Sequence, residues 1–243
     1  MSLLEVRGLG RRFKGLVAVS DVSFDVEAGS ITALIGPNGA GKTTTFNMIA
    51  GALPPSAGSV RFDGRDIVGL APERLCRLGI ARTFQIVRPL TGMSVIENVM
   101  VGGLNRGSNL KVARTAARDL LERVGLGPKA NAPAATLTLP DRKLLETAKA
   151  LATGPRLLML DEVMAGLRPA EADRVVEVLR AMQRDGLTIL LIEHVMRVVM
   201  AIAQRVVVLH HGELIAQGDP STVVADPAVV ACYLGRTPVP RPG

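Results

Sequence analysis

Aromatic side chains are scarce in this sequence. It contains no tryptophan, 1 tyrosine and 5 phenylalanines among 243 residues. Proteins that bind single-stranded nucleic acid stack the bases on several aromatic rings, and this chain has too few rings for such a platform. The formal net charge is +7, but the basic residues are scattered along the chain. We therefore interpret the charge as a solvated surface and expect no nucleic-acid partner.

Cysteine and long apolar segments are also lacking. Cys76 and Cys232 are the only cysteines, and they form neither a disulfide framework nor a metal-ligand spacing. A reducing cytosolic compartment fits this composition. The apolar stretch 195–209 is interrupted by Arg197 and Arg205, so no transmembrane segment is predicted. The first residues also lack the basic and apolar regions of a signal peptide.

Glycine, by contrast, occurs in an informative arrangement. Residues 36–43 match the pattern G-x-x-x-x-G-K-[ST] in full. Glycines at these positions let the backbone turn tightly and point its N–H groups at an anion. Lys42 can reach the β- and γ-phosphates, and the Thr43 hydroxyl can bind Mg²⁺. The predicted phosphate-binding residues are Gly36, Pro37, Asn38, Gly39, Ala40, Gly41, Lys42, Thr43 and Thr44.

The surroundings of this loop support its interpretation. The apolar run 31–35 predicts a buried strand before the loop. Residues 43–50 predict a helix after it, with the helix N-terminus facing the phosphates. Because the motif requires a strand, a loop and a helix in this order, we predict a nucleoside-triphosphate site rather than a chance glycine-rich turn.

Two further elements carry candidate chemistry. The apolar strand 157–160 ends in Asp161 and Glu162. At the carboxyl end of that strand Asp161 can hold Mg²⁺ through water, and Glu162 can activate the attacking water as a general base. His194 follows the next buried strand, 188–192, and can hydrogen-bond the γ-phosphate there. An acidic strand end or a lone histidine is usually structural, so these assignments depend on the phosphate loop.

The pattern of elements predicts an α/β fold, namely a P-loop NTPase with a RecA-like core. Alternating residues 3–7 and 22–26 predict an added antiparallel β layer. Apolar stripes between about 88 and 153 predict an inserted α-helical lobe. We expect one ATPase domain over residues 3–235 and a flexible proline-rich tail over 236–243.

The order of these motifs resembles that of ATP-binding subunits of ABC transporters, over almost the whole chain. The finer resemblance is to the ATPases of importers for branched-chain or hydrophobic amino acids, whose relatives serve amide, urea and aromatic-acid importers. The stretches that carry it are 13–19 (FKGLVAV), 81–85 (ARTFQ), 90–99 (LTGMSVIENV), 165–169 (AGLRP) and 231–235 (ACYLG).

The resemblance implies further roles. Gln85 would sense the γ-phosphate, contribute to the metal site and connect to the membrane subunit. Phe13 would stack on adenine, although core packing is an alternative for a phenylalanine. ATP and Mg²⁺ would be the cofactors, and Lys42, Gln85, Glu162 and His194 the catalytic residues.

The implied partners are permease transmembrane subunits and a second ATPase subunit, with a periplasmic or extracellular solute-binding protein acting indirectly. The chain would then be a peripheral protein at the cytoplasmic face of the cell membrane.

One motif departs from the family pattern. The family signature, Leu-Ser-Gly-Gly-Gln or Leu-Ser-Tyr-Gly-Gln, aligns with Leu137, Thr138, Leu139, Pro140 and Asp141. Proline has no N–H to offer a γ-phosphate, and Asp141 adds negative charge where a phosphate would lie. Since each ATP in this family lies between one subunit's phosphate loop and the other's signature, we favour pairing with a different, signature-complete ATPase. A homodimer that tolerates the variant remains the alternative.

Two other function classes are open to a chain with this loop. A soluble ABC ATPase acting on nucleic acid or ribosomes has only the basic charge in its favour. A P-loop nucleotide kinase is disfavoured by the Asp161–Glu162 pair, by His194 and by the lack of a clear acceptor site.

Overall fold

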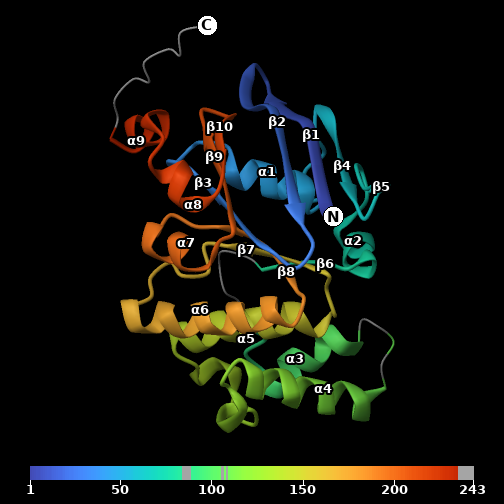
Figure 1. Ribbon diagram of the computed structural model, residues 1–243. Helices are drawn as coiled ribbons and strands as arrows, with labels where there is room; N and C mark the ends of the chain where they lie inside the picture. Colours follow the sequence, from blue (N-terminus) through green and yellow to red (C-terminus); the bar gives the residue numbers. More distant parts are fainter. Residues whose placement is uncertain (84–88, 105–106, 108, 235–243) are drawn as a thin grey trace, which may run out of the picture. The chain divides into compact units, whose positions relative to one another are not determined.

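The computed structural model describes residues 1–83, 89–104, 107 and 109–234, which fall into two compact units (Figure 1). Unit 1 joins residues 1–72 to the segment that begins at Thr188. Unit 2 comprises residues 73–187. The chain therefore leaves the first unit, builds the second and returns.

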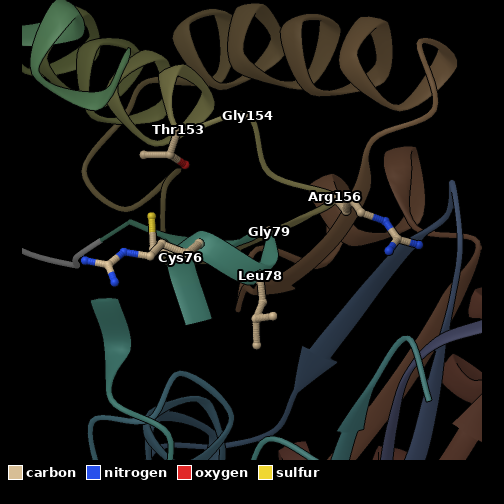
Figure 2. Close-up of a pocket in the computed structure, with 7 residues that line it drawn as sticks. Cys76, Leu78, Gly79, Thr153, Gly154 and Arg156 are labelled. Atoms are coloured by element: carbon tan, nitrogen blue, oxygen red, sulfur yellow. The ribbon is translucent and has the colours of Figure 1, made fainter. Parts of the chain in front are cut away.

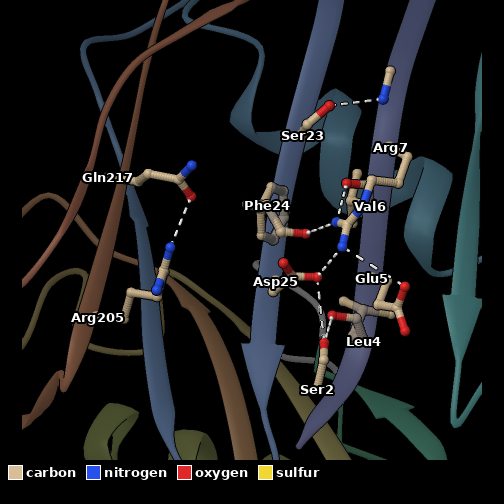
Figure 3. Close-up of polar contacts among 11 residues, drawn as sticks. Ser2, Leu4, Glu5, Val6, Arg7, Ser23, Phe24, Asp25, Arg205 and Gln217 are labelled. Carbon is tan, nitrogen blue, oxygen red and sulfur yellow. Dashed lines mark hydrogen bonds and ion pairs between the residues drawn. The ribbon is translucent and has the colours of Figure 1, made fainter.

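Unit 1 contains an antiparallel sheet with the strand order β2-β1-β4-β5. These strands are β1 (Ser2–Phe13), β2 (Leu16–Glu27), β4 (Ala57–Phe62) and β5 (Arg65–Asp66). Along β2 the apolar Val22, Phe24 and Val26 are buried, whereas Asp25 lies on the polar face. There Asp25 forms a 2.8 Å ion pair with Arg7 of β1 (Figure 3). This alternation is the one expected of a sheet with one covered face.

A second set of strands in unit 1 runs in the order β10-β9-β3-β8. Strand β3 (Ile31–Ile35) is parallel to both β8 (Thr188–Ile192) and β9 (Arg205–His210), and β10 (Glu213–Gly218) is antiparallel to β9. Every residue of β3 and β8 is buried, as apolar runs in parallel sheets require. The helices of this unit are α1 (Lys42–Ile49), α7 (Met196–Ile202), α8 (Pro220–Val224) and α9 (Pro227–Leu234).

Unit 2 contains the parallel strands β6 (Ile80–Arg82) and β7 (Leu157–Asp161). Its helices α3 (Val95–Leu104), α4 (Leu110–Arg123) and α5 (Leu139–Ala152) pack against one another (Figure 1). Helix α4 begins after Asn109, whose side chain accepts a 2.9 Å hydrogen bond from the Val112 N–H. The remaining elements are α2 (Pro72–Leu78), α6 (Pro169–Arg184) and the short 3₁₀ turns η1 (Gly127–Lys129) and η2 (Ala134–Thr136).

A helical lobe was expected at about 88–153, and the described residues of that range fall in unit 2, which also holds β6, β7 and α6. Within the described ranges, no helix has both the length and the apolar character that a bilayer crossing requires.

Two glycines of the antiparallel layer allow a matched stability test. Gly58 and Gly64 both have positive φ, at +85° and +73°. A Cβ on Gly58 would lie 2.3 Å from the Gly8 carbonyl oxygen, whereas a Cβ on Gly64 would meet nothing within 4 Å. Gly64→Ala should lower the free energy of unfolding by only about 1 kcal/mol, because the alanine must adopt a left-handed backbone conformation. Gly58→Ala should cost about 3 kcal/mol or more, because the strands must also move apart.

Urea unfolding of the two variants measures this difference. If both variants lost the same free energy of unfolding, the close approach of β1 to β4 at Gly58 would be contradicted.

Candidate active site

The predicted phosphate loop joins β3 to α1 in unit 1. Two of its glycines are required sterically: a Cβ on Gly36 would lie 2.1 Å from the Leu209 carbonyl oxygen, and one on Gly41 would lie 2.7 Å from that of Ala18. Gly41 is also the left-handed residue that precedes α1. The loop is therefore packed tightly against β2 and β9, which fixes the position of its N–H groups.

Lys42 is buried, and its ammonium group is bound by the loop itself. Its Nζ donates hydrogen bonds to the carbonyl oxygens of Gly36 at 2.7 Å and Pro37 at 2.9 Å. Thr43 is exposed at the first turn of α1. The loop thus brings together a lysine, an exposed hydroxyl group and the N-terminus of a helix. These groups are suited to binding phosphate and a hard cation.

Phe13 lies at the end of β1 and is 40% exposed, so it is not a core residue. The Arg11 guanidinium carbon lies 4.7 Å from its ring centroid. Arg11 also donates a 2.7 Å hydrogen bond to the carbonyl of Pro54, which follows α1. One face of the ring is therefore covered by a guanidinium that is anchored beside the helix of the phosphate loop.

His194 is exposed and follows β8 in the same unit. In the parallel pairing of β3 with β8, Leu34 lies opposite Ile192. Gly36 and His194 each come two residues after this pair. The structure therefore brings His194 to the edge of the sheet where the phosphate loop begins.

Asp161 and Glu162 lie at the end of β7 in unit 2. Asp161 is 3% exposed and forms a 3.0 Å ion pair with Arg82 of β6. Glu162 is partly exposed and has a φ of +50°. Lys143 of α5 donates a 3.1 Å hydrogen bond to the Glu162 carbonyl oxygen. A non-glycine residue held in this conformation is common at functional sites.

The residues aligned with the family signature form the start of α5. Thr138 precedes the helix, and Pro140 occupies its first turn without an N–H. The Asp141 carboxylate is buried within unit 2, where it accepts hydrogen bonds from Lys129 at 2.5 Å and Thr138 at 2.9 Å. Arg174 lies 3.7 Å away. The negative charge expected at this position is therefore compensated by two cations.

Gln85 lies outside the described residues. Tyr233 was not predicted from the sequence: burial raises the pKa of this phenol to about 12, and it has a hydrogen bond with the Gly36 backbone. Helix α9 therefore reaches the base of the phosphate loop.

A pocket of about 510 Å³ lies elsewhere in unit 2 (Figure 2). It is lined by Cys76, Arg77, Leu78, Gly79, Thr153, Gly154 and Arg156. Gly79 and Arg156 directly precede β6 and β7, so the pocket is at the amino ends of these strands. Ligands of open parallel sheets bind at the carboxyl ends, and none of the predicted site residues lines this pocket.

This chain is similar to several known proteins. Residues 19–165 match the family model described as ABC transporter, and residues 213–237 match that described as branched-chain amino acid ATP-binding cassette transporter. The high-affinity branched-chain amino acid transport ATP-binding protein LivG of Salmonella typhimurium is 40% identical, over 96% of this chain and 98% of that protein. BraF of Pseudomonas aeruginosa is 39% identical over the same shares.

A solved structure is also similar. The ADP conformation of an ATP-binding cassette from an ABC transporter superposes with a TM-score of 0.89 at 32% identity, over 97% of this chain and 100% of that one.

This chain belongs to the ABC transporter ATP-binding family.

Membership confirms several predictions made from the sequence. The P-loop NTPase fold, the binding of ATP and the role as the ATPase of a membrane importer are those of this family. ABC ATP-binding subunits dimerise and work with permease subunits. The alternative, a soluble ABC ATPase acting on nucleic acid or ribosomes, has no support among these relatives.

The residues predicted to form the signature have two specific features in the structure. The Thr138 hydroxyl, at the position predicted for the family serine, donates to Asp141. Pro140 removes an N–H. Neither Lys129 nor Arg174 was predicted as a site residue, because both are distant from the signature in sequence and no local pattern links them to Asp141.

The Asp141 cluster predicts a pH-dependent contribution to stability. Burial alone would raise the pKa of Asp141, but hydrogen bonds from Lys129 and Thr138 and the charge of Arg174 outweigh it and hold the pKa below its usual 3.8. The contribution is therefore complete above the unfolded pKa and is lost as pH falls through the folded one.

We expect Asp141→Asn to lower the free energy of unfolding by about 2 kcal/mol at pH 7. The difference in free energy of unfolding between the parent protein and Asp141→Asn should stay constant down to pH about 5 and become smaller below pH about 4. Asp185→Asn is the control, since Asp185 pairs with Arg123 at the surface and should contribute less than about 1 kcal/mol. Urea unfolding at several pH values checks both; a gap that widened on acidification would contradict the assignment.

Proposed function

We propose that this chain is the ATP-hydrolysing subunit of an importer for branched-chain or related amino acids or amides, at the cytoplasmic face of the membrane. The observation that carries the proposal is the similarity to LivG and BraF over 96% of the chain. The C-terminal match at residues 213–237 adds to it, because that segment lies outside the ATPase match at 19–165. Solute specificity would reside mainly in the permease and the solute-binding protein.

Each predicted site residue has a role in this proposal. Lys42 leaves the carbonyls of Gly36 and Pro37 for the β- and γ-phosphates, and the loop N–H groups bind the same oxygens. Phe13 stacks on adenine with its free face. Glu162 accepts a proton from the attacking water. His194 and Gln85 contact the γ-phosphate.

Mg²⁺ fits the donors that the chain offers. Thr43 supplies a hydroxyl oxygen, and Asp161 supplies a buried carboxylate at the carboxyl end of β7. Hard oxygen donors of this kind suit Mg²⁺. When bound, the ion neutralises charge on the transferred phosphoryl group, while Glu162 orients the water.

The ATPase dimer is proposed to be asymmetric. Our reason is that Thr138 is engaged by Asp141 and Pro140 has no N–H, so this signature offers little to a nucleotide on another subunit. A signature-complete sister ATPase would complete the site made by this chain's loop. The opposite site would bind ATP but hydrolyse it slowly. Residues 3–235 would act as one ATPase domain, whose lobe at 88–153 transmits closure to the permease.

Purification of this chain from membranes in mild detergent tests the transporter assignment. We expect two polytopic membrane proteins and a second, signature-complete ATPase to co-purify. The purified complex should hydrolyse ATP, and Glu162→Gln in this chain should reduce turnover by about 100-fold or more, because the general base is lost, while ATP still binds. Recovery of ribosomes or nucleic acid with nothing polytopic would overturn the proposal.

A second experiment isolates the opposite site. In a complex that carries Glu162→Gln, the remaining turnover comes from the partner's loop acting against this chain's signature. Pro140→Gly restores an N–H and should raise that turnover by about tenfold, the value of one charge-assisted hydrogen bond. Pro227→Gly, at the exposed start of α9, is the matched control and should change nothing.

If Pro140→Gly does not change this turnover, the proposed asymmetry of the dimer is overturned. That result would leave the transporter assignment in place.

A further inference from the structure

Arg82 forms an ion pair that the predicted chemistry of Asp161 does not require. Its guanidinium nitrogen lies 3.0 Å from Asp161 Oδ2, and the two side chains are only 13% and 3% exposed. Such a pair is strongly coupled, because removing one partner leaves the other charge buried and uncompensated. In this state of the protein the charge of Asp161 is therefore already neutralised.

The backbone holds this pair in place from both strands. Arg82 lies opposite Met159 in the parallel pairing of β6 with β7. Thr83 donates its N–H to the Met159 carbonyl at 2.9 Å, and its hydroxyl oxygen accepts a 3.5 Å hydrogen bond from the Asp161 N–H. Strand β6 thus places the guanidinium at the carboxyl end of β7.

We propose that Arg82 competes with the bound metal for Asp161. The proposal rests on the assignment of Asp161 to the metal made above. A guanidinium and a divalent cation that share one carboxylate repel each other in a poorly hydrated site. Arg82 therefore stabilises the metal-free protein and reduces the increase in ATP affinity that Mg²⁺ causes.

A purely structural arginine would behave differently. If Arg82 only fastened β6 to β7, its loss would lower stability and weaken ATP binding to the same extent with and without metal. If Arg82 oriented Asp161 for the metal, its loss would weaken the effect of Mg²⁺. Competition alone predicts that the effect of Mg²⁺ on ATP affinity grows when the guanidinium is removed.

The test measures ATP affinity by equilibrium binding to the purified full chain, in Mg²⁺ and in EDTA. All proteins carry Glu162→Gln so that no ATP is hydrolysed. The ratio of the two dissociation constants is the coupling between metal and nucleotide. We expect Arg82→Met to raise this ratio by about fivefold or more, and Arg82→Lys, which keeps the charge, to leave it close to the parent value.

Asp161→Asn separates failure of this inference from failure of the metal assignment. It should lower the ratio, and Arg82→Met should then have no further effect, because the shared carboxylate is gone. If Asp161→Asn leaves the ratio unchanged, the metal assignment fails and this inference fails with it. If Asp161→Asn lowers the ratio but Arg82→Met does not raise it, only the competition is overturned.

A folding defect in Arg82→Met would not end the test. Arg82→Gln keeps a hydrogen-bond donor to Asp161 without the charge and should raise the ratio in the same direction. The double variant Arg82→Met with Asp161→Asn removes both buried charges, which is less costly than removing one. A ratio that is unchanged or lower in Arg82→Gln overturns the proposal.

Discussion

The burial of parallel strands on both faces is the constraint on which this structure depends. Strands β3, β7 and β8 are buried along their whole lengths, and charged side chains appear only where a strand ends. In unit 1 the register of β3 with β8 puts the phosphate loop and His194 at one edge. In unit 2 the pairing of β6 with β7 puts Arg82 beside Asp161. Each chemical group is thus a continuation of a core strand, which explains how loops with little regular structure hold fixed positions.

Two buried carboxylates, Asp161 and Asp141, are each paired with positively charged side chains. Asp161 is paired with Arg82, and Asp141 is held by Lys129, Thr138 and Arg174. A buried carboxylate without such partners would be protonated or would destabilise the fold. The two carboxylates nevertheless differ in meaning. Arg82 is paired with a carboxylate that has a proposed role in catalysis, whereas Lys129 and Arg174 contact a carboxylate among the residues predicted to form the signature.

In the proposed asymmetric dimer, the phosphate loop and the altered signature of this chain would serve different ATP sites. The helix α5 that begins at the signature also supplies Lys143, which binds the main chain at Glu162. One helix of unit 2 therefore carries both the degenerate signature and a support for the predicted general base. Pro140 is compatible with this supporting role of α5, because proline suits the first turn of a helix.

Patterns in the sequence were enough to predict the P-loop NTPase fold, the phosphate loop, the strand that ends in Asp161 and Glu162, and the departure at Pro140. Each of these depends on neighbouring residues: glycine spacing, unbroken apolar runs and the missing N–H of proline are local properties. Other contacts became visible only in the folded chain: Arg82 pairs with Asp161, and Lys129 and Arg174 lie beside Asp141. In the same way, Arg11 covers Phe13 and Tyr233 reaches Gly36. Such contacts join residues far apart in the chain or on different strands, and a charge compensated through space leaves no periodic pattern from which it could be predicted.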